Sequence, residues 1–508
     1  MSQSPLELEL PTGHGRRVLV TGATGYVGGR LIPELLAAGF TVRALARNVP
    51  DLQNRPWFDL IETVEADLQE QDELDVAFQD VHTVLYLVHS MGSSEDFETR
   101  EAEIARGVAA AAETAGVQQI VYLGGLHPDK PLDQLSQHMR SRERVSQILL
   151  ASAVPTLVFQ AAVIIGSGSV SFEMIRHLAE RLPIMPGPSW LKNQIEPIAI
   201  RDVLYYLAQA CALEEPVNRA YGIGCGRAQS FGSMLEDYAA EAGLAPRKVI
   251  PLPIPAQQLS GFWIGMVTPI PRGIAMPLAA SMAEDAVTKN HEIAELIADP
   301  VSGLTTYREA CRRALDRQQR GSLEVTWDDD VLTQQVNNPA NPLPSDPEWA
   351  GHTVYTDIRQ RSGDAPPEAV WRVIETIGGE RGWYSAPALW KIRGLMDQAV
   401  GGYGLARGRK DKHSLRLNDH VDWWRVEAIE PQRKVTLRAE MRAGGRAWLQ
   451  FGVEPLEDGG TRLHQRAVFI PTGLIGRAYW RVIKPFHALI FPTMAKNILE
   501  TAAQQQAL

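Results

Sequence analysis

Up to about residue 205, short apolar runs alternate along the chain with amphipathic helical patterns. The runs are rich in Val, Ile and Leu, which is typical of buried strands that helices cover on both faces. Tyr26–Ala38 is the clearest expected helix, because its apolar side chains share one stripe and Gly39 ends it. The expected strands are Arg17–Thr21, Thr41–Ala46, Ile61–Ala66, Thr83–Val88, Gln119–Leu123 and Pro155–Phe159. This alternation predicts an α/β fold with a doubly wound parallel sheet.

The remainder of the chain divides into three parts. Residues from about 206 to 315 keep helical periodicity but add proline-rich loops, and we interpret them as the substrate-side portion of a first domain, 15–315. Residues 316–347 are polar and are typical of a linker. Residues 348–508 predict a separate α+β domain in which antiparallel strands precede a long helix. These elements are expected at Asp422–Ile429, Lys434–Met441, Ala447–Val453, Thr461–Ile470 and Leu474–Ala503.

The strongest motif lies between the first expected strand and the first expected helix, where three glycines follow one another at three-residue spacing. In such a motif the first glycine allows a tight turn, the second lets the backbone approach a pyrophosphate, and the third permits close packing of helix and strand. The helix N-terminus then offers N–H groups to the phosphates. The motif therefore predicts a Rossmann domain that holds a nicotinamide dinucleotide. The expected contacts are Gly22, Thr24, Gly25, Tyr26, Val27 and Gly28.

The choice between NAD and NADP depends on the end of the second expected strand. An NAD site normally has an Asp or Glu there, which accepts a hydrogen bond from the ribose. This chain has no acid at that position and carries Arg43 and Arg47 instead. Guanidinium groups suit a 2′-phosphate, although both arginines could equally be solvated surface residues. The sequence therefore favours NADP, with NAD still possible.

Two later segments complete the expected cofactor site, since ligands bind beyond the carboxyl ends of the strands in this architecture. Asp67 and Leu68 follow the third strand and are expected to hold the adenine. Leu87, Val88 and His89 follow the fourth strand and are expected to line the nicotinamide-ribose side.

Charge and composition exclude several other classes of protein. The formal net charge of -10 argues against binding to nucleic acid. The three cysteines form no CxxC pair, and the histidines show no metal-ligand spacing, so we expect a reducing, cytoplasmic location and no metal. The N-terminus lacks the pattern of a signal peptide, and the most apolar stretch, Gly261–Ala280, is interrupted by prolines. We expect no integral membrane segment.

The phrases TGATGYVG, YLVHSMG and VYLGGL make the first 310 residues resemble an atypical, extended short-chain dehydrogenase/reductase, close to NmrA-like proteins and to the 39-kDa accessory subunit of respiratory complex I. With its second domain, the whole chain resembles bacterial NAD(P)-binding proteins that end in a DUF2867 domain. That resemblance implies a helix-grip, START-like module with an apolar cavity for the C-terminal part.

The chain departs from that family where the catalytic residues would lie. Active members have a Ser or Thr after the fifth strand and a Tyr-x-x-x-Lys on the next helix, whereas this chain has Gly124 and Gly125 and then His138 and Arg142. Spacing of four places the last two on one helix face, where His138 could relay a proton and Arg142 could bind ribose or phosphate. The neighbouring charge would lower the pKa of His138 and keep it neutral. The alternative is a helix that has lost its catalytic pair.

Two functions of different classes remain open on this evidence. The first is an NADP-dependent oxidoreductase or isomerase that acts on a small hydrophobic molecule. The second is a dinucleotide-binding sensor, scaffold or assembly factor without hydride chemistry, for which a protein partner is possible. The missing Tyr-x-x-x-Lys favours the second, whereas the intact glycine motif is compatible with both.

Overall fold

The chain forms two units, Met1–Gly351 and His352–Leu508, and each is described here by itself. The structure is a computed structural model. It describes residues 8–53, 55–88, 97–187, 189–251, 284–323, 354–386, 414–440 and 444–506, together with residues 268, 276, 281, 390, 409 and 411.

A seven-stranded sheet forms the centre of the first unit, with the order β11-β6-β5-β4-β1-β2-β3 and parallel pairing between all neighbours. Its strands are β1 (Arg17–Thr21), β2 (Thr41–Ala46), β3 (Glu62–Glu65), β4 (Thr83–Tyr86), β5 (Gln119–Gly125), β6 (Thr156–Ala161) and β11 (Arg219–Ile223). The predicted Rossmann-type sheet is confirmed. Its edge strand β11, RAYGI, was not among the expected strands because it is not an apolar run.

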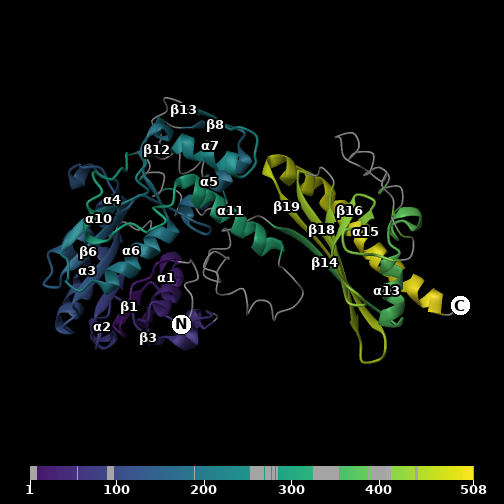
Figure 1. The fold of residues 1–508 in the computed structure, drawn as a ribbon, viewed down its shortest axis with the longest axis horizontal. Coiled ribbons are helices and arrows are strands. Elements are labelled where there is room, and N and C mark those ends of the chain that lie inside the picture. The colour runs from purple at the N-terminus through teal and green to yellow at the C-terminus, as the bar shows by residue number, and fades with distance from the viewer. Residues whose placement is uncertain are drawn as a thin grey trace. The chain divides into compact units, whose positions relative to one another are not determined.

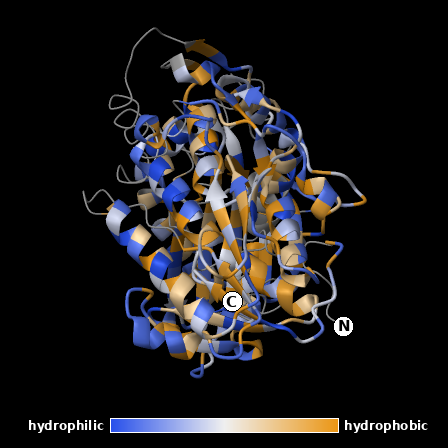
Figure 2. Ribbon diagram, turned by 90° about the vertical axis from the view of Figure 1, so that its left-hand side faces the viewer, coloured by the Kyte–Doolittle hydropathy of each residue, from blue (hydrophilic) through white to orange (hydrophobic). Residues whose placement is uncertain are grey.

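Helices cover both faces of this sheet (Figure 1). On one face α1 packs against α6, and on the other α3 packs against α2 and α4. Successive residues of β1 point to opposite faces of the sheet. Val18 and Val20 pack in the apolar core on the α1 and α6 face, and Leu19 packs in the core on the other face. Figure 2 shows apolar residues concentrated along the central strands. The helices are α1 (Tyr26–Ala37), α2 (Gln71–Ala77), α3 (Phe97–Thr114), α4 (Gln137–Leu150) and α6 (Ile200–Ala212).

A smaller subregion of the first unit has its own apolar core around α5, α7 and α11. We expected this subregion to start near residue 206, but its first helix, α5, lies earlier in the chain. Helix α6, which contains residue 206, and strand β11, which follows it, belong to the main sheet and its covering layer. Its helices are α5 (Val170–Arg181), α7 (Phe231–Glu241) and α11 (Tyr307–Leu323). Its paired short strands are β7 (Val163–Ile165) with β10 (Pro197–Ala199), β8 (Ile184–Gly187) with β13 (Lys248–Pro251), and β9 (Gln194–Ile195) with β12 (Gln229–Ser230).

Helix α11 continues to Leu323, into the segment expected to be a linker from residue 316. The Asp, Arg and Gln residues there are tolerated or favoured in helices, so their polarity does not end the helix. The rest of the expected linker and the stretch from Gly261 to Ala280, apart from residues 268 and 276, lie outside the described residues. The remaining short helices of this unit are α10 (Ile293–Leu296), η1 (Val49–Leu52), η2 (Phe58–Leu60), η3 (Leu132–Gln134) and η4 (Ser189–Lys192).

The second unit is an antiparallel six-stranded sheet, of order β14-β19-β18-β17-β16-β15, packed against helices α13 and α15. This confirms the separate α+β domain. The edge strand β14 was not predicted, because its charged residues alternate with few apolar ones. The elements are β14 (Tyr355–Gly363), α13 (Pro367–Glu375), η5 (Gly379–Arg381), β15 (His420–Val421), β16 (Trp424–Glu430), β17 (Lys434–Ala439), β18 (Gly445–Pro455), β19 (Thr461–Pro471) and α15 (Gly473–Gln506). No helix in the described part of the chain is long and apolar enough to cross a bilayer.

A fully buried ion cluster organises the smaller subregion of the first unit. The Arg176 guanidinium on α5 donates to Glu173 Oε2 at 2.7 Å and lies 3.5 Å from a carboxylate oxygen of Glu180. The Tyr238 hydroxyl on α7 donates to Glu180 at 3.1 Å, so the cluster joins the two helices. Glu173 also accepts the N–H of Gly168 at 3.0 Å, which fixes the loop before α5.

We expect Arg176→Met to lower the free energy of unfolding of the first unit by about 3 to 5 kcal/mol, because it leaves Glu173 buried without its cation. Urea unfolding followed by circular dichroism measures this. The double variant Glu173→Gln/Arg176→Met should recover most of the loss, since it removes both charges together. A loss below about 1 kcal/mol for the single variant would show that water reaches the cluster.

Candidate functional site

The glycine turn between β1 and α1 is held together by approaches that allow no side chain at two positions. Gly22 has a φ of +73°, and a Cβ there would lie 3.2 Å from the carbonyl oxygen of Leu87. A Cβ at Gly28 would lie 2.4 Å from the carbonyl oxygen of Gly22. The first glycine therefore permits the turn, and the third lets α1 lie directly against it.

Helix α1 begins at this turn, and no side chain caps its N-terminus. Gly25 is the N-cap and has no side-chain capping bond, and its N–H donates to the Gly22 carbonyl at 2.9 Å. The first turn of α1 contains no acidic residue. The first N–H groups of a helix lack intrahelical acceptors and carry the positive end of its dipole. The turn therefore suits the pyrophosphate of a dinucleotide.

Thr21, the last residue of β1, places the next part of the expected site. Its hydroxyl donates to the Leu85 carbonyl at 3.1 Å and accepts the N–H of Leu87 at 3.2 Å. These two bonds tie the carboxyl ends of β1 and β4 together, so Leu87 and Val88 lie beside the glycine turn. His89, expected at the same place, lies outside the described residues.

The two arginines expected to bind a 2′-phosphate lie in different environments. The Arg43 guanidinium points across the sheet, where it donates to Glu62 at 2.9 Å and to the carbonyls of Ala77 and Gln79. Arg43 thus connects β2, β3 and the end of α2. Its guanidinium does not lie at the carboxyl edge of the sheet, where a 2′-phosphate would bind. Arg47 follows the last residue of β2, is exposed, and makes no ion pair with any described residue.

Asp67 and Leu68 follow β3 at the same edge of the sheet. Asp67 Oδ1 accepts the N–H of Gln69 at 3.0 Å, and the N–H of Asp67 itself donates to Glu73 at 2.7 Å. Leu68 is buried. These bonds fix a tight turn, which holds the Asp67 carboxylate in place after the strand.

Arg55 was not identified from the sequence, and it lies against the glycine turn. Its side chain is only 5% exposed, and its Nη2 donates to the Thr24 carbonyl at 3.4 Å. A buried cation at this distance adds positive potential to the phosphate side of the turn. No local sequence pattern predicts the contact between Arg55 and Thr24, because the two residues are 31 positions apart in the chain.

Arg142 on α4 lies against Gly125, the second of the two glycines that stand where the family has Ser or Thr. Its Nη2 donates to the Leu123 carbonyl, and its guanidinium lies 5.8 Å from the centroid of the Tyr122 ring. A Cβ at Gly125 would be 3.2 Å from both Cδ and Nε of Arg142. The arginine stem thus occupies the space that a side chain after β5 would need.

His138 lies one turn before Arg142 on the same helix. Burial, and to a lesser extent the nearby charge of Arg142, lowers the pKa of its imidazole to about 3. The ring is therefore neutral at physiological pH, as predicted from the neighbouring charge. A neutral imidazole can donate one hydrogen bond and accept another, but it is a poor proton donor.

A second histidine near this site was not identified from the sequence. His127 lies beyond β5, with Nε2 2.9 Å from Glu143 Oε2 and Nδ1 2.9 Å from the Pro128 carbonyl. The hydrogen bond with Glu143 raises the pKa of His127. Both ring nitrogens are engaged, so His127 fixes the loop after β5 to α4.

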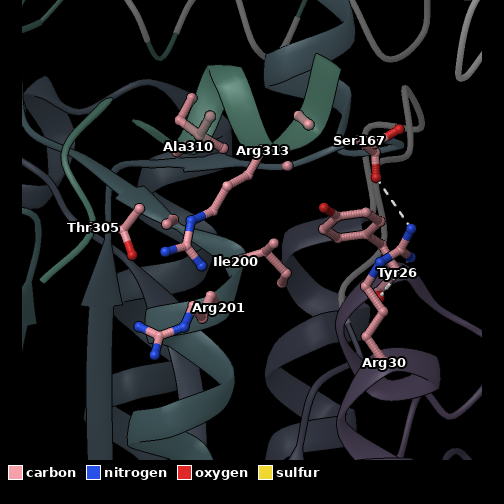
Figure 3. Close-up of a pocket in the computed structure, with 12 residues that line it drawn as sticks. Tyr26, Arg30, Ser167, Ile200, Arg201, Thr305, Ala310 and Arg313 are labelled. Carbon is pink, nitrogen blue, oxygen red and sulfur yellow. Dashed lines mark hydrogen bonds between the residues drawn. The ribbon is translucent and has the colours of Figure 1, made fainter. Parts of the chain in front are cut away.

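A small pocket has Tyr26, the first residue of α1, in its lining (Figure 3). Arg30, Arg201 and Arg313 line it and reach it from α1, α6 and α11. Arg30 donates to the Ser167 carbonyl at 3.1 Å, and the other two arginines pair with carboxylates. The pocket therefore adjoins the glycine turn without presenting an uncompensated cation at α6 or α11.

Two family models match separate parts of the chain. The model described as NAD(P)H-binding matches residues 22–153, which include the glycine turn, Arg47, Asp67 and His138. The model for DUF2867, described as a protein of unknown function, matches residues 349–494. The chain joins an NAD(P)H-binding domain to a DUF2867 domain. This confirms the NAD(P)-binding domain and the C-terminal DUF2867 domain that the sequence predicted.

Individual relatives match only part of the chain. Cinnamoyl-CoA reductase 1 of Oryza sativa subsp. japonica is 30% identical over 137 residues, or 24% of this chain and 40% of that protein. Ceramide reductase of Caulobacter vibrioides is 27% identical over 197 residues, or 38% of this chain and 60% of that protein. The chain therefore spans less than two thirds of the length of either relative.

Solved structures similar to this chain are more distant in sequence. Triphenylmethane reductase of Citrobacter sp., complexed with NADP(H), is 20% identical with a TM-score of 0.46, covering 58% of this chain and 99% of that one. An NADPH-dependent quinone oxidoreductase of Escherichia coli is 19% identical with a TM-score of 0.48, covering 59% and 99%.

We expect Gly28→Ala to raise the Kd for NADPH by about tenfold or more, equivalent to roughly 1.4 kcal/mol, because its methyl group would displace the Gly22 carbonyl. Isothermal titration calorimetry measures the change. Gly107→Ala in α3 is a matched control, since its Cβ meets only the flexible end of Gln71 at 3.3 Å. Unchanged affinity in folded Gly28→Ala would show that the turn does not hold the dinucleotide.

Proposed function

We propose that the first unit is an NADPH-dependent reductase of small hydrophobic carbonyl compounds. The observation that carries the proposal is the glycine turn at the uncapped N-terminus of α1, with His138 and Arg142 on the helix that follows β5. The bound dinucleotide would supply a hydride, and the protein would bind, orient and polarise the acceptor.

The preference for NADPH rests on Arg47. This side chain follows β2, is exposed, and has no acidic neighbour holding it among the described residues. A guanidinium in this position would bind a 2′-phosphate through two parallel hydrogen bonds. Arg43 contributes to the stability of the sheet instead, through Glu62. Arg55 would strengthen binding of either dinucleotide, because it lies beside the turn and not beyond β2.

We expect Arg47→Gln to raise the Kd for NADPH by about 10- to 100-fold, since a hydrogen bond to a charged group contributes about 1.5–3 kcal/mol. The Kd for NADH should change little, because NADH has no 2′-phosphate. Fluorescence titration with both nucleotides measures the ratio. Arg43→Gln is the control and should leave that ratio unchanged. An equal loss of affinity for both nucleotides in Arg47→Gln would remove this residue from the 2′-phosphate site.

The proposed chemistry assigns separate parts to His138 and Arg142. The neutral imidazole of His138 would donate a hydrogen bond to the substrate carbonyl oxygen, which makes its carbon more electrophilic. The permanent charge of Arg142 would stabilise the negative charge that develops on that oxygen. With its lowered pKa, His138 would not itself deliver the proton, so the proton would come from water. Tyr86 and Tyr122 stay neutral here, because burial raises the pKa of both phenols.

The substrate class follows from the lining of this edge and from the two reductases that the chain resembles in part. Leu87 and Val88, which lie beside the turn, are partly buried apolar residues. One of the relatives carries the name of a cinnamoyl-CoA reductase and the other that of a ceramide reductase. Both names denote substrates with large apolar portions. We therefore propose a carbonyl acceptor with an aromatic or alkyl chain.

Stopped-flow oxidation of NADPH against quinones, enones and aldehydes tests the proposal. We expect His138→Ala to lower kcat/KM by about 100-fold with unchanged NADPH affinity, because losing one hydrogen-bond donor to a developing oxyanion costs about 10²–10³-fold. The rate should show no loss from His138 protonation between pH 7 and 5, since its pKa lies near 3. His82→Gln, beside the amino end of β4, is the control. Unchanged turnover in His138→Ala would overturn the assigned role.

A second function, a dinucleotide sensor without hydride chemistry, is favoured by one contact. Arg142 lies close over Gly125 and is bonded to the Leu123 carbonyl, and Gly125 itself has no side chain with which to orient a substrate. Tight NADPH binding without turnover of any acceptor in the panel would support this second function. Turnover of one acceptor with loss in His138→Ala would exclude it.

A further inference from the structure

The C-terminal part of the second unit has an unusual distribution of charge. Over the whole chain Asp and Glu outnumber Lys and Arg by 60 to 50. From Gly459 to Leu499 there is no Asp or Glu at all, although Arg and Lys continue to occur. This segment contains β19 and most of α15. This segment of an acidic chain is thus locally basic.

Helix α15 also exposes large apolar side chains in its first half. Ile475 is 77% exposed, Val482 61% and Phe486 43%, and Leu474 is 48% exposed beside them. The first three are separated by seven and then four residues, so they lie on one face of the helix. Single exposed apolar residues are common on protein surfaces, but a row of them on one helix face marks an interaction site.

The opposite face of the same helix segment is firmly packed. Trp480 is buried and stacks on Phe469 of β19 at 5.7 Å and on Tyr355 of β14 at 5.2 Å. The helix crosses these strands in the second unit (Figure 1). Because Trp480 holds one face against the sheet, the exposed apolar face cannot turn inward.

Two cations lie next to the exposed apolar face. Arg481 and Lys484 are both exposed, and neither forms an ion pair with any residue in the described ranges. Lys496, further along α15, differs, because it lies 3.5 Å from Glu500. An apolar helix face bordered by unneutralised cations is the pattern of a helix that lies in the interface of a membrane.

We propose that this face of α15, defined by Leu474, Ile475, Val482 and Phe486, docks the protein on anionic lipid surfaces. The cations would meet the lipid phosphates while the apolar side chains enter the boundary of the acyl chains. The helix would lie on the membrane and not cross it, in keeping with Pro485 and Pro492 inside it. A second copy of the chain fits less well, because symmetric pairing would bring like charges together.

Sedimentation of the full chain with vesicles tests this proposal. We expect partitioning into mixed phosphatidylcholine–phosphatidylglycerol vesicles to exceed that into phosphatidylcholine alone by about tenfold or more, and to weaken as salt is added. Arg481→Gln/Lys484→Gln should remove about fivefold per cation from binding to the anionic vesicles. Ile475→Ser/Val482→Ser should weaken binding to both kinds of vesicle. All four side chains are exposed, so the variants should remain folded by circular dichroism.

Lys496→Gln is the matched control, since it removes one cation from the same helix, ten residues beyond Phe486 and paired with Glu500. An equal loss in this variant would overturn the proposal in favour of general electrostatic attraction. Dimerisation by light scattering that Ile475→Ser/Val482→Ser abolishes, without vesicle binding, would assign the face to a second copy. Absence of binding to either vesicle would also overturn it. The assay contains no nucleotide, so its result is independent of the proposed reductase activity.

Discussion

The first unit depends on one close approach, that of the Gly22 carbonyl to the backbone of Gly28. A Cβ at position 28 would lie only 2.4 Å from the carbonyl oxygen of Gly22. Helix α1 can therefore pack this close to the turn only because residue 28 has no side chain. The approach fixes the direction of α1, and with it the direction of its first N–H groups. Thr21 then ties the neighbouring strand end to the same turn. The anion site is thus a consequence of backbone packing and not of charged side chains.

The second constraint is the close packing of the Arg142 side chain against Gly125. The guanidinium of arginine is larger than the ammonium of lysine, and here its stem lies 3.2 Å from where a Cβ at residue 125 would be. The arginine at position 142 and the glycine at position 125 are therefore compatible with each other in packing. The same arginine helps to keep His138 neutral. In the proposed site, a neutral imidazole would polarise a carbonyl group more readily than it would transfer a proton.

The sequence predicted the strands that are continuous apolar runs, and β1 and β2 have the expected bounds. It could not predict β11 and β14, because an edge strand exposes much of its surface and needs no apolar run. It also could not separate Arg43 from Arg47. Both are arginines near the end of one strand, and only the parallel register, which sets Arg43 opposite Glu62, shows that the first is held across the sheet. The position of Arg55 depends equally on a long-range contact.

The two proposals concern different units, yet one physical property connects them. A hydrophobic carbonyl compound concentrates in lipid, because its apolar surface is expelled from water. An enzyme that stays in solution meets only the small dissolved fraction, whereas one held at a lipid surface meets the larger one. The basic and apolar face of α15 would therefore increase substrate encounter without any change at His138 or Arg142. No contact between the two units is needed for this effect, since one chain carries both.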